Sequence, residues 1–270
     1  MPARASQPRS ELEGRLSAEV ARIFSEFYGR GPANTRTYVL ERLVFSVLYE
    51  PLTIAEEALI EAGEGDLVRD ARLTFEDIMG HALVDQVERL TRRTVVGYHS
   101  QIVLDPPRAL EWFLLDPGQA EPTTTGSAAP VEELHAGRPG DADAATSDAA
   151  ASAAPQQRGD GADGATRAAL SNAINRIVRD RTGRGATATR TYVLDDCVVC
   201  LLDGALTTVE RTLAEGHRAD LARRLRDAVM ATFEREILEE VGRILERRAV
   251  ALAAQIVLSP DVLLLAIITE

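Results

Sequence analysis

The chain contains an internal repeat, and this feature constrains its fold more than any other. When the sequence is shifted by 154 positions, residues 16–116 align with residues 170–270 without a gap, and about a third of the aligned positions are identical. The best-matched block covers residues 29–40 and recurs at residues 183–194. Since chance does not produce such a match, we expect two copies of one domain.

The composition changes sharply between the two copies. Residues 118–165 are rich in Ala, Gly, Asp, Pro, Ser and Thr and contain almost no large apolar side chains. Such a segment cannot bury enough surface to offset the entropy lost on ordering it. We therefore expect one domain at residues 11–117, a disordered linker at residues 118–165 and a second, divergent domain at residues 166–270.

Local patterns predict the same elements in each copy. Apolar residues at helical spacing predict a first helix that ends at the glycine of a Gly-Arg-Gly sequence, Gly29 in the first copy. Residues 37–40 and 43–48 are short β-rich runs that predict a hairpin. The Thr-x-x-Glu pattern that begins at Thr53 and at Thr207 predicts a helix start with a capping box.

The second part of each copy predicts a long helix and another hairpin. Between Leu67 and Leu90, apolar residues recur in steps of four, so this helix must bury a wide face or bend, with Gly80 as the candidate bend. Residues 94–104 and 109–115 predict the last two strands. The order α-β-β-α-α-β-β in each repeat indicates an α+β fold, with a four-stranded antiparallel sheet covered by helices.

The end of the second copy is unusually apolar. Both faces of the strand within residues 261–270 carry apolar side chains, which is typical of a strand buried on two sides. We therefore expect either an intramolecular pseudo-dimer of the two domains or a homo-oligomer.

Charge and cysteine content exclude several classes of protein. The net charge is −12, with 42 acidic residues against 30 basic ones, all of them arginine, which argues against nucleic-acid binding. The two cysteines give no disulfide framework, the first residues do not form a secretory signal, and no apolar run is long enough to cross a membrane. We expect a cytoplasmic protein without a transmembrane segment.

The Gly-Arg-Gly sequences allow two interpretations. Phosphate-binding loops lead from a strand into a helix, whereas these glycines follow a helix. The order favours a left-handed C-cap, with the arginine beside the last helix carbonyls. The alternative is a patch that binds an anion or an acidic partner, formed by arginines that recur in both copies. These candidates are Arg30, Arg36, Arg176, Arg184 and Arg190.

Candidate catalytic and metal-binding groups are sparse. Cys197 and Cys200 have the C-x-x-C spacing, but a strand places residues three apart on opposite faces, so we interpret them as ordinary strand cysteines. His99 and Ser100 form a candidate ligand site in the first copy only. The spacing of the histidines and cysteines predicts no metal site and no catalytic triad, so we expect no cofactor and no enzymatic activity.

Several motifs together resemble a known family. They are Gly29-Arg30-Gly31-Pro32, the following hairpin, Leu52-Thr53-x-x-Glu56, the long amphipathic helix and Val95-Val96-Gly97-Tyr98-His99-Ser100. This arrangement resembles the MpsC-like family, a domain of unknown function described as part of a Na+-translocating, membrane-potential-generating system. The resemblance covers both copies, and the second departs from it at Ala186 and at Leu252-Ala253-Ala254.

The resemblance implies a soluble accessory or regulatory protein linked to a membrane ion or inorganic-carbon transport system. Together with the lack of a catalytic constellation, it predicts a non-enzymatic protein that binds a protein partner, which can be a membrane transport complex. The alternative is a small-ligand or anion sensor that uses the Gly-Arg-Gly loops and the arginines that follow them.

Overall fold

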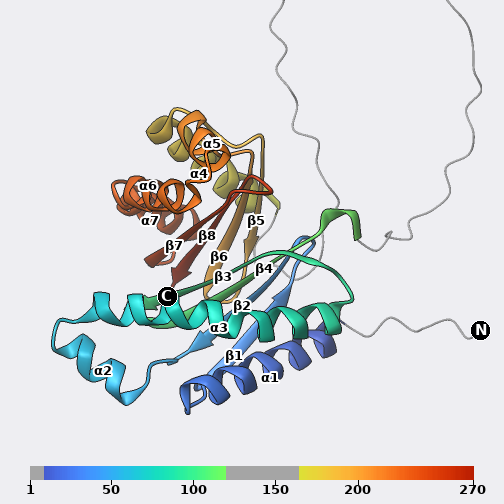
Figure 1. The fold of residues 1–270 in the computed structure, drawn as a ribbon. Coiled ribbons are helices and arrows are strands. Elements are labelled where there is room, and N and C mark those ends of the chain that lie inside the picture. Colours follow the sequence, from blue (N-terminus) through green and yellow to red (C-terminus); the bar gives the residue numbers. More distant parts are fainter. Residues whose placement is uncertain (1–8, 120–163) are drawn as a thin grey trace, which may run out of the picture. The chain divides into compact units, whose positions relative to one another are not determined.

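The first half of the chain folds into an antiparallel sheet with helices packed against it (Figure 1). The computed structural model describes residues 9–119 and 164–270, so most of the expected linker lies outside the described residues. The sheet order is β1-β2-β4-β3. The elements are α1 (Arg9–Tyr28), β1 (Asn34–Val39), β2 (Leu43–Tyr49), α2 (Ile54–Glu61), α3 (Gly65–Thr91), β3 (Val95–Leu104), β4 (Pro107–Leu115) and the 3-10 helix η1 (Pro117–Gln119).

The second half repeats this topology. Its sheet order is β5-β6-β8-β7, and every neighbouring pair is antiparallel, as in the first half. The predicted α+β fold with one four-stranded sheet per repeat is therefore confirmed. The elements are α4 (Gly164–Thr182), β5 (Ala188–Val193), β6 (Cys197–Asp203), α5 (Thr208–Glu215), α6 (Ala219–Ala231), α7 (Glu234–Leu245), β7 (Ala249–Val257) and β8 (Val262–Thr269).

Glycine ends the first helix of each half. Gly29 has φ +69° and its amide donates to the Ser25 carbonyl over 2.9 Å, while Gly183 has φ +75° and its amide donates to the Arg179 carbonyl over 2.9 Å. A residue with a Cβ is strained in this left-handed conformation. The predicted left-handed C-caps are confirmed.

Both predicted capping boxes are also present. The Thr53 hydroxyl accepts from the Glu56 amide, and the Glu56 carboxylate accepts from the Thr53 amide over 2.7 Å. The second half has the same reciprocal bonds between Thr207 and Glu210. Each box satisfies early helix amides that would otherwise have no partner.

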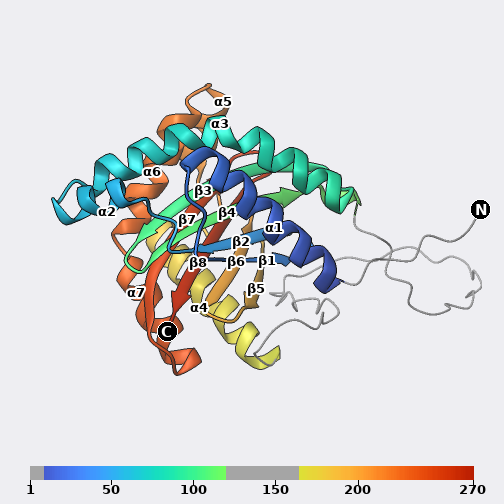
Figure 2. The same ribbon diagram turned by 90° about the horizontal axis from the view of Figure 1, so that it is seen from below.

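The long helix differs between the halves. α3 runs through Gly80 as one helix that curves over its sheet (Figure 2). In the second half the chain leaves the helix between α6 and α7, at Thr232 and Phe233. The Thr232 hydroxyl donates to the Val229 carbonyl over 2.7 Å, a local bond that competes with the helical backbone pattern.

Gly80 provides space for an aromatic ring rather than breaking the helix. A Cβ at Gly80 would lie 2.6 Å from Cε1 of Tyr98 on β3, closer than side-chain atoms approach one another. The equivalent residues in the second half are Glu234 and Leu252. Glycine is therefore required in the first half, where the Tyr98 ring packs against α3, whereas the second half has the smaller Leu252 side chain in this place.

Each sheet has one face toward its own helices. In the first half, α1 and α3 bury residues such as Phe24 and Leu83 against Phe113 of β4. In the second half, α4 and α7 bury residues such as Ile174 and Ile237 against their own sheet.

The opposite faces of the two sheets share one hydrophobic core. Phe45 and Trp112 of the first half belong to the same buried cluster as Val199, Leu264 and Ala266 of the second half. All positions of β8 are buried, which agrees with the two-sided burial expected from its sequence. Both repeats belong to one compact unit. Each supplies an apolar surface that the other covers.

Among the described helices, none is both long and apolar enough to cross a membrane.

Candidate functional site

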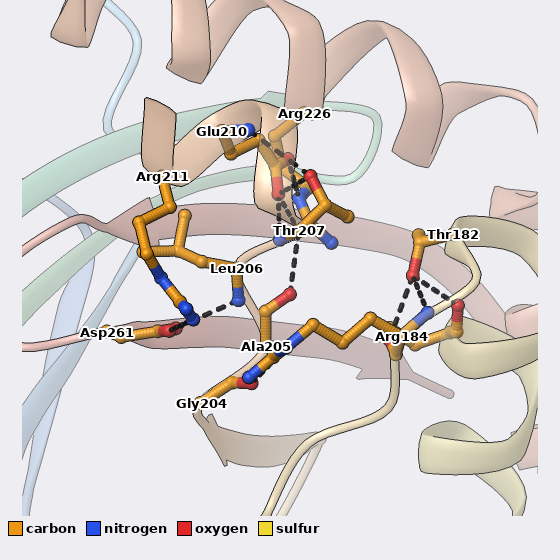
Figure 3. Close-up of polar contacts among 11 residues, drawn as sticks. Thr182, Arg184, Gly204, Ala205, Leu206, Thr207, Glu210, Arg211, Arg226 and Asp261 are labelled. Atoms are coloured by element: carbon orange, nitrogen blue, oxygen red, sulfur yellow. Dashed lines mark hydrogen bonds and ion pairs between the residues drawn. The ribbon is translucent and has the colours of Figure 1, made fainter. Parts of the chain in front are cut away.

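A buried ion pair holds the loop after the second strand of each half. In the second half, Arg226 Nε donates to Glu210 Oε1 over 2.6 Å, and Arg226 Nη2 donates to the Ala205 carbonyl over 2.9 Å (Figure 3). In the first half, Arg72 Nε donates to Glu56 over 2.7 Å and Nη2 donates to the Pro51 carbonyl over 2.9 Å. Each capping-box carboxylate therefore binds an arginine as well as the helix terminus.

The ion pair of the second half is almost completely removed from water. Arg226 is 1% exposed and Glu210 is 3% exposed, so removal of one partner would leave the other charge out of water. Burial by itself raises the pKa of Glu56, but the hydrogen bonds from Arg72 and from the Thr53 amide outweigh burial and lower the pKa below its ordinary value. The carboxylate is therefore held in its charged form.

The Thr-x-x-Glu pattern indicates the Thr and Glu of this junction but not the arginines. Arg72 and Arg226 occupy equivalent repeat positions, each 16 residues after its glutamate. The sequence alone shows that both copies have an arginine at this position. The sequence does not show which residue each arginine binds, because a helix can present an arginine in any direction.

The arginines of the Gly-Arg-Gly sequences fasten the same loops. Arg30 Nη1 donates to the Leu52 carbonyl over 3.1 Å, and Arg184 Nε donates to the Gly204 carbonyl over 3.2 Å (Figure 3). Each guanidinium thus contacts a loop carbonyl rather than the helix carbonyls that the C-cap interpretation placed beside it. In each half, two arginines therefore donate to neighbouring carbonyls of the loop after the second strand.

The remaining candidate arginines form ion pairs. Arg36 Nη1 lies 2.6 Å from Asp195 Oδ2, and the equivalent Arg190 lies 3.7 Å from Glu41. Both pairs join one half to the other. Arg176 lies 3.6 Å from Glu240 within the second half. Each of the five candidate arginines therefore has an oxygen of the protein itself as a partner.

Two further contacts between the halves follow the same symmetry. Arg42 Nη1 lies 2.8 Å from Asp203 Oδ1, and the Tyr49 hydroxyl donates to Asp196 Oδ1 over 2.9 Å. Shifting by 154 positions converts one pair of positions into the other. Reciprocal contacts of this kind are typical of a two-fold interface.

His99 and Ser100 do not share a site, because neighbouring strand residues point to opposite faces. The Ser100 hydroxyl donates to Glu111 Oε1 over 2.9 Å, and the Tyr98 hydroxyl donates to Glu111 Oε2 over 2.8 Å, on the helix-covered face of the sheet. Glu111 is fully buried. The equivalent residues of the second half are all apolar, so this polar cluster is specific to the first half. They are Leu252, Ala254 and Leu265.

His99 instead faces the other half. Its Nδ1 lies 2.9 Å from Nε2 of Gln255 on β7. Burial, and secondarily the positive charge of Arg223, lower the pKa of His99 to about 4. The ring is therefore neutral at pH 7.

A solvent-open cavity of about 700 Å³ lies beside His99. Its walls come from the start of β3, from α5 and α6, and from the turn between β7 and β8. The lining residues are Val96, Gly97, Tyr98, His99, Leu206, Arg211, Ala214, Glu215, Ala219, Arg223, Val257, Leu258, Ser259 and Asp261. The loop between β6 and α5, drawn in Figure 3, forms part of this wall through Leu206. Asp261 accepts from the Leu206 amide over 2.9 Å and lies 3.6 Å from Arg211, which holds these three lining residues together.

The two cysteines behave as strand residues. Cys197 belongs to the core shared by the sheets, and Cys200 belongs to the core beneath the helices, which confirms that they point to opposite faces. Burial raises the pKa of Cys200 to about 12 and that of Cys197 well above its ordinary value. Both thiols are free and protonated. The described residues contain no group of three or more side chains arranged to hold a metal ion.

Comparison with known proteins agrees with the repeat structure. No curated protein and no solved structure matches the chain closely enough to extend the comparison. The family model for the Na+-translocating membrane potential-generating system (MpsC) matches residues 8–117 and again residues 162–270. The chain therefore belongs to the MpsC family and contains two tandem copies of its domain.

Proposed function

We propose that this protein is a cytoplasmic, non-enzymatic accessory component that binds a protein partner within a membrane ion transport system. The family description supplies the link to ion transport. The observation that carries partner binding is the exposure of large apolar side chains on the surface of α2 and α3 in the first half. Large apolar side chains there are unusually exposed: Ile54 77%, Leu67 53%, Leu73 57%, Phe75 36% and Ile78 59%.

This surface is specific to the first half. The repeat equivalents of Ile54, Leu73 and Ile78 are Thr208, Asp227 and Thr232, which are polar. Thr208 and Asp227 lie within α5 and α6, so helices of this fold accept polar residues at these two positions, whereas Thr232 lies at the break between α6 and α7. Exposed large apolar side chains that the other repeat replaces with polar ones favour an interaction site on α2 and α3.

The charge around this surface indicates the chemistry of the partner. Exposed acidic residues outnumber exposed arginines on the same segment, with only Arg69 among the latter. The acidic residues are Glu57, Glu61, Glu64, Asp66 and Asp70. An anionic lipid surface would be repelled, whereas a segment that is both apolar and basic would be attracted. Cytoplasmic loops of membrane proteins carry an excess of Lys and Arg, so a basic amphipathic loop or helix of a transport protein fits this surface.

The test is binding of a defined probe. An amphipathic peptide of leucine and lysine is titrated onto the protein by fluorescence anisotropy, with a leucine and glutamate peptide of the same apolar pattern as the charge control. We expect the basic peptide to bind and the triple variant Ile54→Thr, Leu73→Asp, Ile78→Gln to weaken binding at least about tenfold, with glutamine chosen at position 78 because it favours helix. The control variant Val209→Ala removes an exposed apolar residue of α5, 59% exposed, and should leave binding unchanged.

Two results would overturn this proposal. One is equal binding of the basic peptide by the triple variant and by the unmodified protein. The other is a concentration-dependent dimer in sedimentation that the triple variant abolishes, because a second copy would then occupy the surface.

Anion sensing through the Gly-Arg-Gly loops is the alternative function. Arg30 and Arg184 already donate to loop carbonyls, so an anion would have to compete with these bonds. Stabilisation by phosphate or bicarbonate in a thermal-shift experiment, lost in an Arg30→Gln, Arg184→Gln variant, would favour this alternative.

A further inference from the structure

The cavity beside His99 combines an apolar surface with a small number of polar groups. Apolar side chains from both halves line it, including Val96, Val257 and Leu258. Its volume of about 700 Å³ lies within the range of small-molecule sites. The cavity does not involve α2 or α3, so a ligand bound in it would be independent of the proposed partner surface.

Divergence between the repeats gives this cavity its chemistry. The repeat equivalents of His99 and Arg211 are Ala253 and Glu57, so the opposite side of the two-fold interface has neither the imidazole nor this arginine. Gln101, the equivalent of Gln255, has its side-chain oxygen buried without a hydrogen-bond partner. The contact between histidine and glutamine is therefore formed on one side only.

The hydrogen bond from Gln255 fixes the tautomer of His99. The amide nitrogen of glutamine can only donate, so Nδ1 of His99 accepts the bond and the neutral ring carries its proton on Nε2. Among described residues, Gln255 is the one hydrogen-bonding partner of the ring. The Nε2 proton is thus available as a donor.

The two arginines that line the cavity differ in their ion pairing. Arg211 lies 3.6 Å from Asp261, which neutralises much of its charge. Arg223 forms no ion pair within 4 Å among the described residues, although its positive charge interacts with Asp227 and influences His99. Glu215 and Asp261 also line the cavity, and their negative charges disfavour a doubly charged ligand such as phosphate.

We propose that this cavity binds a small organic monocarboxylate with a short apolar body. Arg223 and the His99 Nε2 proton bind the carboxylate, and Val257 and Leu258 contact the hydrocarbon. A guanidinium pairs with a carboxylate through strong charge-assisted hydrogen bonds, while the apolar wall favours a ligand larger than a simple inorganic anion.

The experiment uses butyrate as the probe and the full chain as the protein. Butyrate, inorganic phosphate and butylammonium are titrated at constant ionic strength, and binding is followed by amide chemical shifts and by thermal stability. We expect butyrate to perturb residues that line the cavity and to raise the melting temperature, and we expect neither phosphate nor butylammonium to do so.

Matched variants locate the site. Arg223→Gln and His99→Ala should each weaken butyrate binding at least about tenfold, since a hydrogen bond to a charged group is lost. The control Arg69→Gln changes the repeat equivalent of Arg223 on α3 and should leave butyrate binding unchanged. Peptide binding should be the same in Arg223→Gln as in the unmodified protein, which separates this site from the partner surface.

Two results would overturn the assignment. Unchanged butyrate affinity in Arg223→Gln would exclude the cavity as the site. Binding of phosphate as tight as that of butyrate would show a general anion site without the apolar selectivity.

Discussion

Arg36 of β1 forms an ion pair with Asp195 of the turn between β5 and β6, with 2.6 Å between Nη1 and Oδ2. The equivalent residues, Arg190 and Glu41, form the reciprocal contact between the halves at 3.7 Å. The two repeats thus face one another as the subunits of an isologous dimer do. A tandem duplication has placed both partners of this interface in one chain.

Contacts across this interface should differ in energy according to burial. The Arg36 and Asp195 side chains are 46% and 67% exposed, so Arg36→Met should cost at most about 1 kcal/mol and the loss should shrink at high salt. Arg42 and Asp203 are 14% and 20% exposed, so Arg42→Met should cost about 1–3 kcal/mol. Urea unfolding at two salt concentrations measures both effects. Equal losses of unfolding free energy in the two variants would contradict the prediction that burial sets the strength of each contact.

Removal of Arg226 should destabilise the fold strongly. Arg226→Met leaves the Glu210 carboxylate buried without its cation, which should cost about 3–5 kcal/mol. The double variant Arg226→Met, Glu210→Leu removes both charges and should recover a large part of this loss. Equilibrium unfolding in urea gives the comparison. If the double variant were as unstable as the single one, the lost charge pairing would not be the cause.

Gly80→Ala should destabilise the first half although alanine favours helix. A gain of about 1 kcal/mol from helix propensity opposes the collision with the Tyr98 ring, and overpacking should dominate by about 1–3 kcal/mol. In a Tyr98→Leu background, which copies Leu252 of the second half, Gly80→Ala should become neutral or stabilising. A double-mutant cycle in thermal unfolding measures this coupling. Additive effects would mean that the ring does not set the requirement for glycine.

His99 should make stability depend on pH. Because burial lowers its folded pKa to about 4 while the unfolded value is about 6.5, the neutral ring stabilises the fold fully above about pH 6.5. This contribution, roughly 3 kcal/mol at most, is lost as pH falls from about 6.5 to about 4. Urea unfolding from pH 7 to pH 4 should therefore give a steeper fall for the unmodified protein than for His99→Ala. Parallel curves would show that His99 titrates normally in the folded state.

The sequence determined the local structure of this protein. The repeat follows from comparing the sequence with itself. The other correct predictions depend on residues that are close together in the chain, so spacing is enough to make them. They are the glycine C-caps, the capping boxes and the alternation of Cys197 and Cys200 between the two faces of a strand. The two-sided burial of β8 was likewise visible in its composition.

Only the tertiary structure decided which side chains meet. The arginines of the candidate anion patch were visible in the sequence, but their partners Asp195, Glu41 and Gly204 are distant along the chain or belong to the other repeat. Similarly, His99 and Ser100 are adjacent in sequence yet lie on opposite faces of β3, beside Gln255 and Glu111 respectively. Helix and strand periodicity assigns a side chain to a face, whereas the residue opposite that face depends on how two sheets pack. Packing is a property of whole surfaces, and the repeat alone did not specify it.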